Sequence, residues 1–88
     1  MRPDRSSVAE SIEEFKTLGE DAFLEKYARG ARPRRYYLVH KGERIPLKAL
    51  WAGAHRPTKL TKEFSTADAR RGLRPLGFDR FFPEKISN

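Results

Sequence analysis

The chain has 88 residues, no cysteine and a formal net charge of +7. A chain this short is expected to form one domain with a thin core, because a domain of about 60 residues buries only about 60% of its unfolded surface. The lack of cysteine excludes a disulfide framework and a thiolate metal site. No apolar run approaches the roughly 18 residues of a membrane span, and the amino terminus has no signal-peptide core. We therefore expect a cytoplasmic protein without membrane contact.

The charge is unevenly distributed along the chain. Residues 1–28 contain 4 basic and 7 acidic residues, a net charge of −3, whereas residues 29–88 contain 15 basic and 5 acidic residues, a net charge of +10. Of the 19 basic residues 12 are Arg, the side chain suited to bidentate contact with phosphate and guanine. This pattern indicates a partner with dense negative charge, most commonly nucleic acid. The alternative is a basic surface that only keeps the protein soluble.

The first predicted element is a helix with one apolar face. Residues 1–6 are expected to form a flexible lead-in, followed by one compact domain over residues 7–88. Ser7 and Glu10 match a capping box, which would start the helix at that point. The residues at helical spacing on its apolar face are Val8, Ile12 and Phe15, with Leu18 beside them. Gly19 is expected to end the helix.

A second amphipathic helix follows Gly19. Glu20 and Asp21 lie where the positive end of its dipole favours acidic residues. Its apolar residues are Phe23, Leu24 and Tyr27. Gly30 is a suitable left-handed stop. The two acidic helices are expected to brace the fold.

The next stretch predicts a β-hairpin that leads directly into a helix. Residues 36–39 are β-favouring, Lys41-Gly42 is placed for a tight turn, and Ile45 continues the second strand. Pro46 is expected at the first helical position, because its φ suits a helix and it has no N–H to leave unpaired. The helix over residues 47–54 is almost entirely apolar.

The aromatic residues of this stretch can each be interpreted as core residues or as contacts with nucleic acid. Leu47, Leu50, Trp51 and Ala54 fall on one helix face, so Trp51 is assigned to the core rather than to base stacking. Two adjacent tyrosines on a strand point to opposite sides, so one ring faces outward as a candidate base or sugar contact. The sequence does not say which of them it is.

The last third of the chain predicts a basic loop, a helix and a strand. Residues 55–59 form the loop, and Leu60 and Phe64 are expected to pack it onto the core. Ser65 and Asp68 match a second capping pattern, which opens a helix over residues 67–76. Its last turn is expected to be irregular at Pro75, and Gly77 is expected to end it. Leu73 and Leu76 should face the core, whereas the outward residues should be Arg70, Arg71 and Arg74. The chain is then expected to return to the core as a third short strand with Phe78, Phe81 and Phe82. Together the elements predict a small single α+β domain with two N-terminal helices, a β-hairpin, two helices and a short C-terminal strand.

Residues with catalytic or metal-binding chemistry are scarce. His40 and His55 are the two histidines, and no acidic cluster stands at metal-ligand spacing near either. There is no glycine-rich phosphate loop and no hydrolase or metalloprotease motif. Glu43 and Glu63 have basic neighbours and are more simply solvated ion-pair partners. We therefore expect a protein that is not an enzyme and uses neither cofactor nor metal.

The candidate nucleic-acid contacts are basic residues in and around the hairpin and the apolar helix. They are Arg34, Arg35, Lys41, Arg44, Lys48, His55, Arg56 and Lys59. Because hairpin and helix are joined without a linker, these residues are expected on one surface. Lys48 is the one charge in the apolar run 45–54, which favours a phosphate contact. An ion pair between Lys48 and an acid of the first two helices is the structural alternative.

Three segments resemble a known family. They are F-x-x-L-G-x-x-A-F-L-x-K-Y over residues 15–27, YYLVHKGERIPLKALWAGAH over residues 36–55, and L-x-x-x-F-S with L-x-x-L-G-F between residues 60 and 78. This pattern resembles the amino-terminal head domain of McrA-like HNH restriction endonucleases, which attack modified DNA. The resemblance implies a DNA-associated module of restriction systems. The HNH motif is missing from the sequence, so the resemblance implies a stand-alone head without the nuclease.

Two functions of different classes follow. The first is a nucleic-acid-binding module, for double-stranded DNA and in particular modified DNA, that belongs to a restriction-modification or defence system and works with a protein of that system. The second is a protein-interaction adaptor that docks a partner through the acidic helices. A helix-turn-helix regulator fits less well, because the loop between the two basic helices is too long for that motif. Base preference, DNA versus RNA and oligomeric state stay open.

Overall fold

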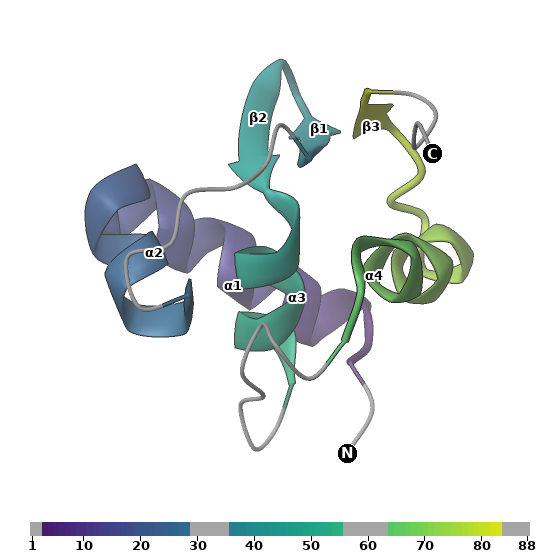
Figure 1. Cartoon of the computed structure of the whole chain (residues 1–88), viewed down its shortest axis with the longest axis horizontal. Coiled ribbons are helices and arrows are strands. Elements are labelled where there is room, and N and C mark those ends of the chain that lie inside the picture. Colours follow the sequence, from purple (N-terminus) through teal and green to yellow (C-terminus); the bar gives the residue numbers. More distant parts are fainter. Residues whose placement is uncertain (1–2, 29–35, 56–63, 84–88) are drawn as a thin grey trace.

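The computed structural model describes residues 3–28, 36–55 and 64–83 of the chain. Its elements follow the predicted order of two helices, a hairpin, two further helices and a short third strand (Figure 1). They are α1 (Arg5–Leu18), α2 (Glu20–Ala28), β1 (Tyr37–His40), β2 (Glu43–Pro46), α3 (Leu47–Ala54), α4 (Thr66–Leu73), the 3₁₀ turn η2 (Arg74–Leu76) and β3 (Phe81–Phe82). The α+β fold class is therefore confirmed.

Helix α1 begins earlier than the sequence predicts. Asp4 is its N-cap: the Asp4 carboxylate accepts a hydrogen bond from the Ser7 backbone N–H (2.8 Å), and the Ser7 hydroxyl accepts one from the Asp4 N–H (2.9 Å). The prediction of a box between Ser7 and Glu10 is therefore wrong. Asp and Ser are about equally good N-caps. The apolar pattern begins only at Val8, so it does not distinguish the two starts.

The two acidic helices pack tightly against each other. Gly19 ends α1 with φ 84°, a conformation in which a side chain would be strained. Phe15 of α1 meets Phe23 of α2 edge to face, with ring centroids 5.4 Å apart. Glu14 of α1 accepts hydrogen bonds from the Tyr27 hydroxyl and the Lys26 ammonium of α2. The predicted brace is thus held by aromatic packing and by one shared carboxylate. The predicted stop at Gly30 lies outside the described residues.

The hairpin has the predicted two-residue turn. Lys41 and Gly42 both have positive φ, 49° and 81°, as a two-residue hairpin turn that follows the strand twist requires. His40 pairs with Glu43, and at the other end Tyr37 pairs with Pro46.

The junction between hairpin and helix differs from the prediction by one residue. Pro46 is the last residue of β2 and the N-cap of α3, with φ −54° and ψ 119°, so it is not the first helical residue. It stays extended because it still pairs with Tyr37. The Leu47 N–H then donates to the Tyr36 carbonyl (3.1 Å), which fixes the start of α3 against the sheet.

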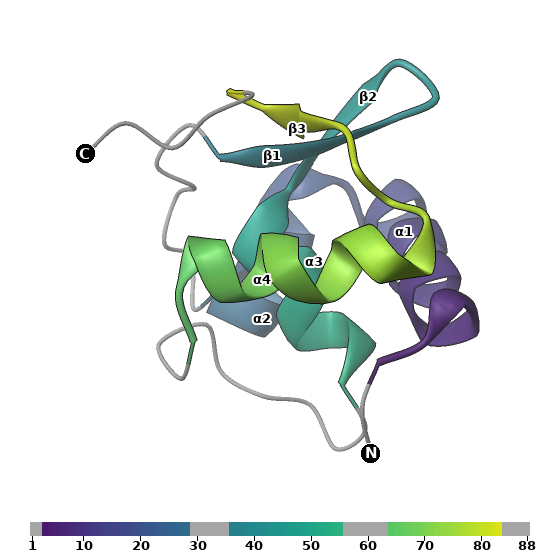
Figure 2. The ribbon, with the colours of Figure 1, turned by 90° about the vertical axis from the view of Figure 1, so that its right-hand side faces the viewer.

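β1 is the central strand of an antiparallel sheet in the order β2-β1-β3. Leu38 of β1 is in register with Ile45 on one side and with Phe81 on the other, and all three side chains are buried. Figure 2 shows the four helices on one face of this sheet. We call that face the inner face and the opposite one the outer face.

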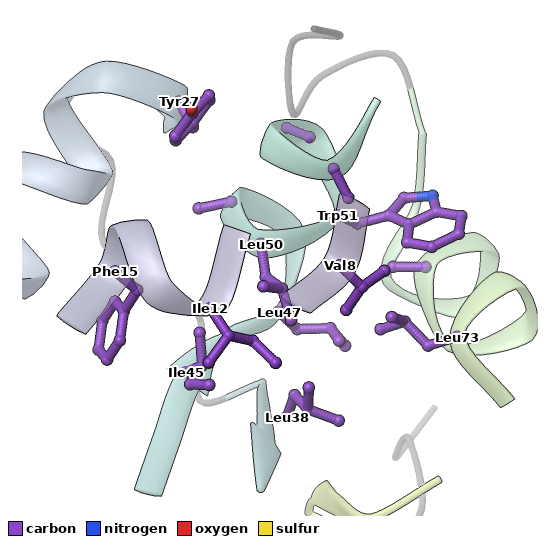
Figure 3. Packing of buried hydrophobic residues seen from close by; sticks show 14 of the residues in the cluster. Val8, Ile12, Phe15, Tyr27, Leu38, Ile45, Leu47, Leu50, Trp51 and Leu73 are labelled. Carbon is purple, nitrogen blue, oxygen red and sulfur yellow. The ribbon is translucent and has the colours of Figure 1, made fainter. Parts of the chain in front are cut away.

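Helix α3 forms the centre of the core (Figure 3). Every residue of α3 except Lys48 is buried, and Trp51 lies in the core as predicted. The Ser11 hydroxyl of α1 donates to the Leu50 carbonyl (3.0 Å). At Gly53 a Cβ atom would lie 2.8 Å from the Ser11 Oγ. The close approach of α1 to α3 therefore needs glycine at this position.

Helix α4 has the predicted cap and the predicted irregular end. The Ser65 hydroxyl accepts the Asp68 N–H (3.1 Å), and the Asp68 carboxylate accepts the Ser65 N–H (3.0 Å). The α-helix stops at Leu73, and the chain continues through Pro75 as the 3₁₀ turn η2. Gly77 ends this turn with a left-handed φ of 94°.

Two side chains near the end of the described chain differ from their predicted positions. Arg70 is 4% exposed, so the expectation that it points outward is wrong. Phe82 is 39% exposed, so the expectation that it returns to the core is also wrong, whereas Phe81 is buried as expected. Adjacent residues of a strand point to opposite sides, so the two phenylalanines cannot both face inward. Within the described part of the chain, no helix is long and apolar enough to cross a membrane.

Candidate nucleic-acid interface

The predicted contacts divide into described and undescribed residues. Lys41, Arg44, Lys48 and His55 are described. The other four, which lie outside the described residues, are Arg34, Arg35, Arg56 and Lys59.

Lys41 and Arg44 present their charges on the hairpin. Lys41 is exposed in the turn, and Arg44 is exposed on β2. The Cζ atom of Arg44 lies 4.1 Å from the centroid of the Phe82 ring. Because β1 separates β2 from β3, the Arg44 side chain must cross the central strand to reach this ring. A cation over an aromatic face is attracted by the quadrupole of the ring, so Phe82 helps to fix the position of the guanidinium.

Lys48 is directed to a different part of the molecule. It lies in the first turn of α3 and is half-buried, with its ammonium 5.8 Å from the centroid of the Phe64 ring, immediately before the Ser65 cap of α4. Among the described residues, no carboxylate of α1 or α2 forms a salt bridge with Lys48. Arg44 and Lys48 thus contact different parts of the molecule.

His55 is buried rather than a polar surface residue. It is 9% exposed, and its Nδ1 atom lies 2.7 Å from the Trp51 carbonyl oxygen. Its ring packs edge to face on Trp51, with centroids 5.1 Å apart, and stacks on Phe64 at 6.0 Å. These contacts cap the end of α3 and leave little of the ring for a ligand. The structure therefore places His55 in the core and corrects its predicted surface position.

Strand alternation defines the outer face of the sheet. Tyr36 packs on the core, so its neighbour Tyr37 is the outward ring, and Tyr37 is in register with Phe82. The Val39 N–H donates to the Arg80 carbonyl (2.9 Å), which continues the pairing beyond β3 and places Arg80 in the row of Val39 and Arg44. Phe82 and Arg80 are not among the site residues predicted from the sequence. The alternation of residues 80–82 would place both side chains on the outer face, but this can be seen only once the pairing of these residues with β1 is known.

Arg70 and Arg74 enclose Phe81 at the edge of the sheet. Their Cζ atoms lie 5.0 Å and 5.4 Å from the centroid of its ring. Arg70 also donates from Nη2 to the Pro83 carbonyl (2.5 Å), which ties α4 to the chain after β3. Burial lowers the pKa of the Arg70 guanidinium, and Arg74 lowers it further, whereas Tyr36 raises it. Arginine nevertheless stays charged in proteins, so Arg70 is a buried cation with a structural role.

The described residues contain no group of three or more His, Cys, Asp or Glu residues that could hold a metal ion. The chemistry that these residues offer is cationic and aromatic: guanidinium and ammonium groups that suit phosphate, the exposed Phe82 ring and the half-buried Tyr37 ring on the sheet.

The comparison with protein families finds a match over most of the chain. The family model described as "ScoMcrA-like, N-terminal head domain" matches residues 3–80, which is most of the chain. The chain therefore belongs to the family of ScoMcrA-like N-terminal head domains, and the predicted resemblance to McrA-like heads is confirmed. No curated protein and no solved structure matches the chain.

Proposed function

We propose that this chain is a double-stranded DNA-binding module of a restriction or defence system. The observation that carries the proposal is the pair of exposed cations on the hairpin, Lys41 and Arg44, in the part of the chain with a net charge of +10. The family match supports it, because McrA-like proteins are restriction-related. The family model describes a head domain, so we assign any cleavage of the bound DNA to another domain or to a partner protein.

The hairpin suits contact with the DNA backbone for two physical reasons. Release of counterions from phosphates favours binding of Lys and Arg without regard to sequence. The hairpin is also rigid before binding, because its turn is tight and β2 continues directly into the buried helix α3. Less side-chain and backbone freedom is then lost on binding. We propose Lys41, Arg44 and Lys48 as backbone contacts, together with Arg34, Arg35, Arg56 and Lys59; the buried His55 supports α3 instead.

Charge reversal on the hairpin tests the proposal. The variant Lys41→Glu with Arg44→Glu is compared with Arg5→Glu with Lys16→Glu, which changes the net charge equally but on exposed positions of the acidic helix α1. In a mobility-shift assay we expect the hairpin variant to bind duplex DNA at least about tenfold more weakly and the control variant to stay within about twofold of wild type. Equal losses in both variants would show that only net charge matters, and no loss in the hairpin variant would remove the hairpin from the interface. Arg34→Glu with Arg35→Glu extends the test to the preceding segment.

A second function, a protein-interaction adaptor, is favoured by one observation on α1. Leu18 is 41% exposed at the end of this helix, next to the acidic first turn of α2. If the hairpin variant keeps full DNA affinity, this surface becomes the better candidate for the function of the domain.

A further inference from the structure

Two large apolar side chains are strongly exposed among the described residues, Leu18 and Phe82. Leu18 is the last residue of α1, next to the acidic first turn of α2. Phe82 lies on the outer face of the sheet. The four helices cover only the inner face (Figure 2). A single exposed apolar side chain needs no special explanation, so the groups around Phe82 decide whether this part of the outer face has a function.

Phe82 is surrounded by cationic and aromatic groups. Tyr37 is its partner in register on β1, and the Arg44 guanidinium lies over its ring at 4.1 Å. Arg80 stands two residues before it on the same side of the strand. The outer face thus combines a phenyl ring, a phenol ring and a guanidinium plane within one small area.

The acidic residue of the hairpin strands points away from the outer face. Glu43 precedes Arg44 on β2, so strand alternation directs its carboxylate to the opposite side. Among the residues of the three strands, the outer face therefore carries the positive charge of Arg44 and no carboxylate. Its charge is complementary to a nucleic-acid strand and unfavourable for the same face of a second copy.

The aromatic surface distinguishes between paired and unpaired DNA. In a duplex the faces of the bases are covered by their stacked neighbours, so an aromatic platform gains no stacking contact. In a single strand or at an extruded nucleotide, the base face is free to stack on aromatic rings or on an arginine plane, and the backbone phosphates follow nearby cations.

We propose that the outer face of the sheet binds unpaired nucleotides of DNA, with a base stacked on the Arg44 guanidinium that Phe82 supports and beside Tyr37. Arg80 and Lys41 then lie along the path of the flanking phosphates. This inference rests on the proposed DNA-binding function and adds a ligand class to it. The domain binds duplex DNA through backbone charge and gains affinity where a base is unpaired or has been flipped out.

The test separates the guanidinium plane from its charge. Arg44→Lys keeps the positive charge but loses the planar group, and Phe82→Ala removes the ring that supports it. Leu18→Ala is the matched control, because Leu18 and Phe82 are similarly exposed, 41% and 39%, on different parts of the molecule. Thermal unfolding checks that each variant is folded. We expect all three to stay folded, because the side chains of Arg44, Phe82 and Leu18 are exposed.

Fluorescence anisotropy is measured with a single-stranded oligodeoxynucleotide, with the fully paired duplex of the same length, and with that duplex containing one unpaired base. We expect Arg44→Lys and Phe82→Ala to weaken binding to both unpaired probes by roughly tenfold, the loss of about one stacked base. Both variants should lose clearly less affinity for the paired duplex than for the unpaired probes, because each keeps a positive charge at residue 44. Leu18→Ala should stay within about twofold of wild type on all three probes. Equal losses on paired and unpaired probes, or none on the unpaired probes, would overturn the stacking site while leaving the duplex-binding function intact. If the wild-type protein binds none of the three probes, both the proposed function and this inference fail.

Discussion

At Gly72, helix α4 approaches α3 so closely that a single methyl group has no room. A Cβ atom at this position would lie 2.2 Å from the Cζ2 atom and 2.4 Å from the Cη2 atom of the Trp51 indole. Helix propensity alone predicts that Gly72→Ala stabilises the protein by about 1 kcal/mol. The clash predicts the opposite sign, a destabilisation of about 1–3 kcal/mol, because the large buried ring has to move.

Chemical denaturation of Gly72→Ala measures this sign directly. Trp51→Phe removes the two indole atoms that clash, so the alanine should cost much less when it is introduced into the Trp51→Phe background. A stabilised Gly72→Ala variant in the wild-type background would contradict the observed packing of α4 on α3.

At the scale of elements, the contact between α1 and α2 depends on pH. Burial raises the pKa of the Tyr27 hydroxyl above its ordinary value of 10.0, and the hydrogen bond to Glu14 raises it further. The hydrogen bond to Glu14 likewise raises the pKa of Lys26 above 10.5. Both groups hold their protons more tightly in the folded state. Their contribution is therefore complete below about pH 10 and is lost as the pH rises through the raised values.

Tyr27→Phe isolates the tyrosine part of this dependence. We expect the variant to be less stable at pH 7 by about 1 kcal/mol, because its hydrogen bond to Glu14 is gone. Its melting temperature should also fall less steeply than that of wild type between neutral pH and pH 11. Parallel pH profiles for the two proteins would show that the Tyr27 hydroxyl is not held as the structure has it.

The sequence was sufficient to predict features that neighbouring residues determine. It was not sufficient where a side chain's position depends on a segment far away in the sequence. Lys41-Gly42, the Ser65 cap and the Pro75 irregularity are each specified by neighbouring residues, and the structure confirms them. The burial of Arg70 was not predictable, because its partners are Phe81 of β3 and Pro83 after it, and the sequence does not show how β3 pairs with β1. A long side chain can also bury its apolar stem, so the charge of an arginine does not by itself show that the residue is exposed.

The same limit applies to the candidate site. The exposed cations of the hairpin follow from charge and turn pattern, whereas the stacking of Arg44 on Phe82 depends on the register of β1 with β3. His55 was misplaced for a related reason: its ring packs on Phe64, which lies across the loop from it.

At the scale of the whole molecule, the chain separates two tasks. The acidic helices α1 and α2 pack against α3 and support it, and the basic part of the chain carries the hairpin and the outer face of the sheet. If the domain binds DNA as proposed, this division would orient the hairpin toward the phosphates during approach. Binding should then be fast at low salt and strongly weakened by added salt.

The salt dependence of duplex-DNA affinity is the most direct test of the hairpin as the DNA-contacting element. The logarithm of the association constant is measured against the logarithm of salt concentration for wild type and for Lys41→Ala with Arg44→Ala. If both cations neutralise phosphates, the variant binds more weakly at every salt concentration and its slope is smaller by about two. An unchanged slope in a variant that remains folded would show that neither side chain contacts phosphate, and would contradict the account.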